Sequence, residues 1–260
     1  MSKKKLVTLA VGDEYQRLER VSGPSRREYA KRHGWQYEVI ERIPDSFRQR
    51  FPGARFGWVC NLYKLLLPEL NQEYDLVAYM DNDSVVSPRA SCLSSYSDQL
   101  PSGGFAAVQT VHFAERARFH PEWAANYYAE LPLGDLIVRN VEAQINGGLL
   151  LFRPREVRDA WTALLNSDTP LNEENRLNAH EVQAGRCLFL PGEWNLLWMY
   201  EKYRLGILRP QRNPFDKLWN RAYNRYIGKW HERARMNDAL NRCFMLHLAF
   251  EHRKIHWLRM

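Results

Sequence analysis

Two carboxylates one residue apart, Asp81 and Asp83, follow an apolar run in the segment 74–86, which reads Tyr-Asp-Leu-Val-Ala-Tyr-Met-Asp-Asn-Asp-Ser-Val-Val. Residues i and i+2 of an extended strand point the same way, so this spacing predicts that the two carboxylates converge. Mg²⁺ and Mn²⁺ accept carboxylate oxygens and keep positions open for phosphate oxygens. The pair therefore indicates a divalent metal held against a diphosphate, and a strand followed by a plain polar turn is the alternative.

The elements that precede this pair predict a β-α-β unit. Residues 6–11 favour a buried strand, residues 25–32 a helix with Pro24 near its start, and residues 36–40 a second strand. Residues 12–15 would then form the loop at the carboxyl end of the first strand, the edge at which open α/β sheets bind ligands. Val11 and Tyr15 are accordingly candidates for contact with a nucleotide, as is Asn82 between the two aspartates.

Further elements are expected along the rest of the chain, and residues 112–140 are expected to cover the site. Lys64 is a candidate phosphate partner, or an ordinary lysine on a helix surface. Gly147 and Gly148 form a flexible corner that can approach a ligand, or a simple turn at a strand edge. The expected elements are helices at 61–70 and 157–165, strands at 105–111, 145–152 and 187–190, and a core segment at 243–248.

Composition fits one α/β domain with a basic bias. The 260 residues are 45% hydrophobic and carry a net charge of +7, which favours anionic partners such as nucleotides or anionic lipid. The four cysteines have no Cys-x-x-Cys spacing, which indicates a reducing cytoplasm. Residues 6–11 are too short for a signal peptide, and no run approaches the ~20 apolar residues that span a bilayer, so any membrane contact is expected to be peripheral.

Four segments together resemble the retaining GT-A glycosyltransferases: 25–37, 80–83, 146–152 and 244–249. The likeness covers most of residues 5–250. It is closest to the superfamily of yeast-type α-galactosyl- and α-mannosyltransferases and plant xyloglucan xylosyltransferases, and more distant to bacterial lipopolysaccharide α-glycosyltransferases. It implies an α/β fold of the GT-A type, with a Rossmann-like mixed sheet flanked by helices. Residues 1–212 would form the catalytic domain, and residues 213–260 a helical, basic and aromatic segment.

The resemblance also implies a nucleotide-sugar donor, UDP-sugar being the first candidate, and Mn²⁺ or Mg²⁺. Asp83 would bind the metal directly, Asp81 the metal or the ribose, and His247 would be a further metal ligand returned to the core by the C-terminal segment. An imidazole is an acceptable Mn²⁺ ligand. A core histidine bound to a backbone carbonyl is the alternative for His247.

On the sugar side, the resemblance assigns Asn146, Gly147 and Gly148 to the turn that contacts the transferred sugar. Glu181, or secondly Gln183, would lie near the anomeric carbon, although the family more usually shows an adjacent acid-Gln pair. Trp194 and Asn195 resemble a Trp-Asn pair that stacks on or hydrogen-bonds a sugar, and a structural tryptophan is the alternative.

Two departures from the family bear on location and acceptor. Phe250 replaces the family's glycine three residues after the histidine, and we expect no membrane anchor like that of the Golgi members. We therefore expect a cytoplasmic, bacterial enzyme that makes surface polysaccharide or lipopolysaccharide on a saccharide or lipid-linked acceptor. Its basic aromatic tail either contacts the inner face of an anionic membrane or packs its aromatic residues inward.

Two other functions compete with this interpretation. A sugar nucleotidyltransferase would normally show a glycine-rich, basic loop after the first strand, whereas Gly12-Asp13-Glu14 is acidic. A non-catalytic basic protein that binds nucleic acid or membrane would leave the aspartate pair unexplained. Under the transferase interpretation, no nucleic-acid partner is expected.

Overall fold

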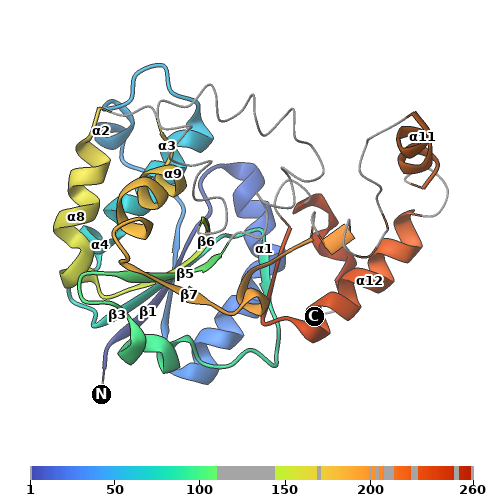
Figure 1. The fold of residues 1–260 in the computed structure, drawn as a ribbon, viewed down its shortest axis with the longest axis horizontal. Coiled ribbons are helices and arrows are strands. Elements are labelled where there is room, and N and C mark those ends of the chain that lie inside the picture. The colour runs from blue at the N-terminus through green and yellow to red at the C-terminus, as the bar shows by residue number, and fades with distance from the viewer. Residues whose placement is uncertain are drawn as a thin grey trace.

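A mixed six-stranded sheet forms the centre of the molecule in the computed structural model (Figure 1). The structure describes residues 2–109, 144–168, 171–198, 201–202, 205, 207, 214–223, 228–248 and 252–258. In the strand order β2-β1-β3-β6-β5-β7, only β6 runs against its neighbours. The strands are β1 (Lys4–Leu9), β2 (Gln36–Ile40), β3 (Leu76–Met80), β5 (Phe105–Gln109), β6 (Ile145–Phe152) and β7 (Cys187–Leu190). This confirms the expected α/β fold class of the GT-A type.

Helices cover both faces of this sheet, because alternate residues of the buried strands point to opposite sides. Val7, Val77 and Tyr79 pack in one apolar cluster with Leu62 and Trp161. Leu6, Ala78 and Met80 pack in a second cluster with Tyr29. The helices are α1 (Asp13–His33), α2 (Asp45–Arg48), α3 (Phe56–Tyr63), α4 (Leu67–Leu70), α8 (Pro154–Asn166), α9 (Glu173–Leu177), α11 (Pro214–Ala222) and α12 (Gly228–Arg242).

A second, three-stranded sheet returns the C-terminal part of the chain to the end of β3. Its order is β4-β9-β8, with β4 at Ser84–Val86, β8 at Leu196–Leu197 and β9 at Met245–His247. Strands β4 and β9 are antiparallel, with Ser84 opposite His247. This pairing brings His247 next to the aspartate pair although more than 160 residues separate them in sequence.

Two expectations about the first half of the chain are wrong. Residues 12–15 are not a free loop, because α1 begins at Asp13 and continues through Pro24 to His33. Asp13 and Glu14 lie in its first turn, where negative charges interact favourably with the helix dipole and stabilise the helix. The helix expected at 61–70 starts at Phe56 and runs as α3, a short 3₁₀ turn (Lys64–Leu66) and α4.

The flexible corner expected at residues 146–148 is also absent, because these residues belong to β6. The pairing of β5 with β6 shifts register between Ala107, opposite Leu150, and Val108, opposite Asn146, so residues 147–149 of β6 are left out of the pairing with β5. The expected cover at 112–140, the end of the strand expected at 105–111, and Phe250 lie outside the described residues. Within the described residues, none of the helices is long and apolar enough to cross a bilayer.

Candidate active site

A tight turn between β3 and β4 carries the two aspartates. Strand β3 ends at Met80, and Asp81 N donates to Gly148 O at 2.9 Å, which ties the turn to β6. Ser84 N then donates to Asp81 O at 3.2 Å and closes the turn. The carboxylates therefore converge because the chain turns, and not because Asp81 and Asp83 share one face of a strand as their spacing suggested.

Side chains of helix α1 hydrogen-bond to the backbone of this turn. Ser22 Oγ donates to Asn82 O at 2.6 Å, and Asn82 Nδ2 donates to Tyr15 O at 3.1 Å. The fully buried guanidinium of Arg26 donates to Ser84 O and, at 3.4 Å, to Asp81 O. Asn82 is thus 4% exposed and binds the start of α1 in this structure.

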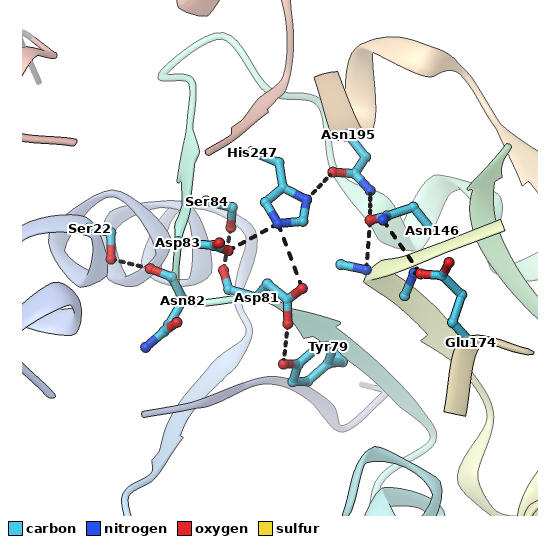
Figure 2. A network of polar contacts seen from close by, with 12 residues as sticks. Ser22, Tyr79, Asp81, Asn82, Asp83, Ser84, Asn146, Glu174, Asn195 and His247 are labelled. Atoms are coloured by element: carbon cyan, nitrogen blue, oxygen red, sulfur yellow. Dashed lines mark hydrogen bonds and ion pairs between the residues drawn. The ribbon is translucent and has the colours of Figure 1, made fainter. Parts of the chain in front are cut away.

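His247 completes a cluster of three potential metal ligands with the two aspartates (Figure 2). Its Nε2 lies 3.0 Å from Asp83 Oδ1 and 3.7 Å from Asp81 Oδ2. One ligand atom from each residue lies within 4.8 Å of the others. Burial by itself lowers the pKa of His247, but contact with Asp83 and the charge of Asp81 outweigh burial, so the pKa is raised. Two carboxylates and one imidazole are a donor set that fits Mn²⁺ or Mg²⁺.

A chain of hydrogen bonds starting at a backbone amide sets the orientation of His247. Gly148 N donates to Asn146 Oδ1 at 2.9 Å. The same Asn146 oxygen also accepts a hydrogen bond from Asn195 Nδ2, at 2.7 Å. Asn195 Oδ1 is thereby turned toward His247 Nδ1, at 2.9 Å, and can only accept a hydrogen bond from it. Nε2 is the ring nitrogen left to face the carboxylates.

The absence of a side chain at Gly148 makes room for the imidazole. A Cβ at this position would lie 2.5 Å from His247 Cε1 and 2.7 Å from Asn146 Oδ1. Gly147 is similarly confined, since a Cβ there would lie 2.8 Å from Glu173 Oε1. The two glycines therefore allow close packing of protein side chains on β6, whereas the sequence suggested close approach of a ligand.

Lys64 is buried between two carboxylates. Its Nζ lies 3.1 Å from Asp81 Oδ1 and 3.0 Å from Glu173 Oε1, and it donates to Gly147 O at 3.3 Å. Burial by itself lowers the pKa of Lys64, but the two carboxylates raise it well above its ordinary value. Tyr79 OH also donates to Asp81 Oδ1. Lys64 thus holds Asp81 in place, and any phosphate contact would be additional to these ion pairs.

Two acidic residues that the sequence analysis did not single out, Glu173 and Glu174, lie in the first turn of α9 beside this network. Glu174 Oε2 accepts from Gly147 N at 2.9 Å and from Asn146 Nδ2 at 3.5 Å. Burial and the neighbouring charge of Glu173 raise the pKa of Glu174 to about 7. The adjacent acidic pair Glu173-Glu174 was the signal available in the sequence.

Glu181 and Gln183, the residues expected near the anomeric carbon, are absent from the polar network drawn in Figure 2. The side chain of Glu181 is buried, and both of its oxygens accept from Arg186, at 2.8 and 2.9 Å. Gln183 is exposed and follows the helical turn Asn178–Val182.

The remaining expected contacts divide between the core and the surface. Trp194 is fully buried, with its ring 6.0 Å from Tyr29 and 5.2 Å from Phe244, so its indole packs in the core. Val11 is also buried. Tyr15 is 41% exposed on the first turn of α1, and partial burial followed by the charge of Asp83 raises the pKa of its phenol. Of these three residues, only Tyr15 presents its side chain to solvent.

Comparison with known proteins supports the fold as that of glycosyltransferases. No family model and no curated protein matches this sequence. Among solved structures, a glycosyltransferase involved in glycosylation of the major capsid of PBCV-1 is 10% identical with a TM-score of 0.55, and covers 98% of this chain and 100% of its own. The galactosyltransferase LgtC, in complex with donor and acceptor sugar analogues, is 15% identical with a TM-score of 0.52. The match covers 94% of this chain and 86% of the LgtC chain.

The WbbM bifunctional glycosyltransferase is 17% identical with a TM-score of 0.53, and the match covers 95% of this chain. This chain spans about half of that larger protein, 46%. At these identities, the similarity shows a shared fold.

Proposed function

We propose that this protein is a metal-dependent glycosyltransferase. It transfers a sugar from a nucleotide-diphosphate sugar, with a UDP-hexose as the first candidate, to a saccharide or lipid-linked acceptor and retains the anomeric configuration. The expected setting is the synthesis of bacterial surface polysaccharide or lipopolysaccharide. The observation that carries the proposal is the convergence of Asp81, Asp83 and His247 at the end of β3 in a fold of this class.

A bound Mn²⁺ or Mg²⁺ would supply positive charge to neutralise the departing diphosphate. Asp83 and His247 Nε2 would hold the ion, with Asp81 as a third ligand. Asn195 keeps Nε2 directed at the site through the hydrogen bond to Nδ1. Lys64 fixes one oxygen of Asp81, which leaves Oδ2 on the side of His247.

Asn146 and its neighbours are the proposed contacts of the transferred sugar. Glu174 hydrogen-bonds Asn146, whereas Glu181 is paired with Arg186. We therefore add Glu174 to Glu181 and Gln183 as candidates for the residue near the anomeric carbon. In the reaction, the acceptor hydroxyl oxygen forms a bond to the anomeric carbon, and its proton passes to the departing diphosphate oxygen. The bond from that carbon to the diphosphate oxygen breaks, and its electron pair leaves with the nucleoside diphosphate.

Slow hydrolysis of the donor tests this function without knowledge of the acceptor. The protein is incubated with Mn²⁺ and a panel of nucleotide sugars, and we expect release of free sugar and nucleoside diphosphate from one of them. A nucleotidyltransferase would instead exchange pyrophosphate, and a binding protein would turn over none of the panel.

Asp83→Asn provides the residue-level test. We expect it to lower the rate by about 100- to 1000-fold, as loss of one electrostatic contact at a transition state typically does. Asp159→Asn, an exposed aspartate on α8, is the matched control and should leave the rate unchanged. Full turnover by Asp83→Asn, or activity that survives complete removal of divalent metal, would refute the proposal.

A further inference from the structure

Helix α11 has its apolar side turned away from the protein. Phe215, Leu218, Trp219 and Ala222 recur at the i, i+3, i+4, i+7 spacing of one helix face, and all four are exposed. The exposed fractions of the three large side chains are 78% for Phe215, 63% for Leu218 and 40% for Trp219. A surface helix normally packs such a stripe against the core, so this orientation calls for a partner.

The side of α11 that carries Asn220 faces inward. Asn220 and Tyr223, at the end of the helix, are 7% and 4% exposed. Tyr223 OH is 2.9 Å from His231 Nδ1, which joins this end of the chain segment to α12. Figure 1 shows α11 next to α12, at the end of the molecule opposite α8. The apolar stripe therefore points outward while Asn220 and Tyr223 are buried against the protein.

A second exposed aromatic residue and a local excess of positive charge belong to the same region. Trp230 on α12 is 82% exposed, the highest fraction among the large apolar side chains described as exposed. Residues 214–235 contain six Lys and Arg and two acidic residues, a net charge of +4 out of +7 for the whole chain. One of the two acids, Glu232, is buried and paired with Lys254 at 2.6 Å. Arg221, Arg233 and Arg235 are exposed.

We propose that the stripe of α11, together with Trp230, inserts into the interface of an anionic lipid bilayer. A helix with an exposed apolar face bordered by arginine suits this environment, because the apolar side chains enter the acyl boundary while the cations meet lipid phosphates. Tryptophan favours the same depth, where its ring is buried and its N–H stays near polar groups. The positive charge favours anionic lipid over a second copy of this chain, whose corresponding surface would repel it. The proposal is independent of the proposed catalytic function.

Co-sedimentation with lipid vesicles tests this surface. We expect the protein to bind vesicles of phosphatidylcholine with phosphatidylglycerol at low salt, to bind pure phosphatidylcholine less, and to dissociate as salt is raised. The variant Phe215→Ser/Leu218→Ser/Trp230→Ser should bind these vesicles with an affinity at least about tenfold lower, since each substitution removes apolar surface that would be buried in the bilayer.

The matched control is Leu70→Ser/Phe189→Ser, which removes exposed apolar side chains on α4 and β7. It should bind vesicles as the unaltered protein does, and thermal unfolding of both variants checks that they are folded. Vesicle binding that persists in the α11 variant, or no binding by the unaltered protein, overturns the proposal. Self-association that the α11 variant abolishes, without vesicle binding, would also overturn it and assign the surface to a second copy.

Discussion

His247 and Asn195 form a hydrogen bond of 2.9 Å between Nδ1 and Oδ1, and this contact directs the opposite ring nitrogen toward Asp83. The sequence resemblance placed Asn195 against a sugar. In the structure, both ends of its side-chain amide are used within the protein, one by His247 and the other by Asn146. Asn195 is thus a positioning residue for the proposed metal ligand.

Asn195→Leu should therefore weaken metal binding. We expect Mn²⁺ affinity to fall about 10- to 100-fold, the usual effect of losing a partner that orients a metal-binding histidine. Isothermal titration calorimetry with Mn²⁺ alone measures this. Asn166→Leu is the control, because Asn166 is exposed and contacts Arg50 instead. Unchanged affinity in Asn195→Leu would show that the imidazole is oriented without this contact.

Gly148→Ala should damage the same site by crowding. The added Cβ would meet His247 atoms at 2.5 and 2.7 Å, and the 3% exposed ring is enclosed by protein. We expect a loss of about 1–3 kcal/mol in the free energy of unfolding, typical of overpacking, together with weaker Mn²⁺ binding. Chemical denaturation and metal titration measure the two effects.

Gly57→Ala is the control for that substitution. Gly57 lies in α3, and a Cβ there meets nothing within 4 Å. Because alanine favours a helix by up to about 1 kcal/mol over glycine, the control should be neutral or slightly more stable. If Gly148→Ala behaves like Gly57→Ala, the close approach of His247 to β6 does not limit this position.

Local patterns predicted the fold class and the approximate positions of most strands, because buried β-strands leave apolar runs that can be read directly. The aspartate pair was also visible, although its geometry comes from the turn at 81–83, which spacing alone does not specify. Pro24 predicts a helix start, whereas the contacts of Ser22 and Arg26 with the aspartate turn favour one continuous helix α1.

The site itself was predictable only in part, since its contacts join segments distant in sequence. Glu173 and Glu174 gained significance only through Lys64 and Gly147, which lie 109 and 27 positions away respectively. Trp194 could not be assigned to core or surface from its type alone, because tryptophan serves both. Its packing against Tyr29 decides for the core in this structure.

Glu174 should make stability depend on pH. Its pKa is raised from 4.5 to about 7, first by burial. At a pH between these two values, Glu174 is therefore protonated in the folded protein and ionised in the unfolded chain. Stability contributed by the protonated form is therefore fully present below about pH 4.5 and declines as pH rises through about 7. A shift of this size corresponds to roughly 2–4 kcal/mol between the two limits.

Glu174→Gln imitates the protonated carboxyl and should remove this dependence. Thermal unfolding of metal-free protein at pH 5 and pH 8 measures it: the unaltered protein should lose more stability than the variant over this interval. At pH 8 the variant should be the more stable of the two. Equal losses in both proteins would show that Glu174 is already ionised at pH 5.

Arg26→Met should lower the free energy of unfolding, because Arg26 neutralises Glu19 and hydrogen-bonds to the aspartate turn. Arg26 is fully buried and forms an ion pair with Glu19, which is 8% exposed and accepts from Tyr37 OH at 2.6 Å. Removal of the guanidinium leaves Glu19 as a buried charge without its cation, at a cost of about 3–5 kcal/mol. Arg20→Met, an exposed position on the same helix, should change stability by less than about 0.5 kcal/mol.

The double variant Arg26→Met/Glu19→Leu separates loss of the charge pair from loss of support for the turn. Because it removes both charges, its free energy of unfolding should recover by at least about half of the Arg26→Met loss. We expect Arg26→Met also to weaken Mn²⁺ binding, and this loss should remain in the double variant, since Asp81 O and Ser84 O still lack the guanidinium as a donor. Recovery of stability and metal affinity together would mean that Arg26 serves only to neutralise Glu19.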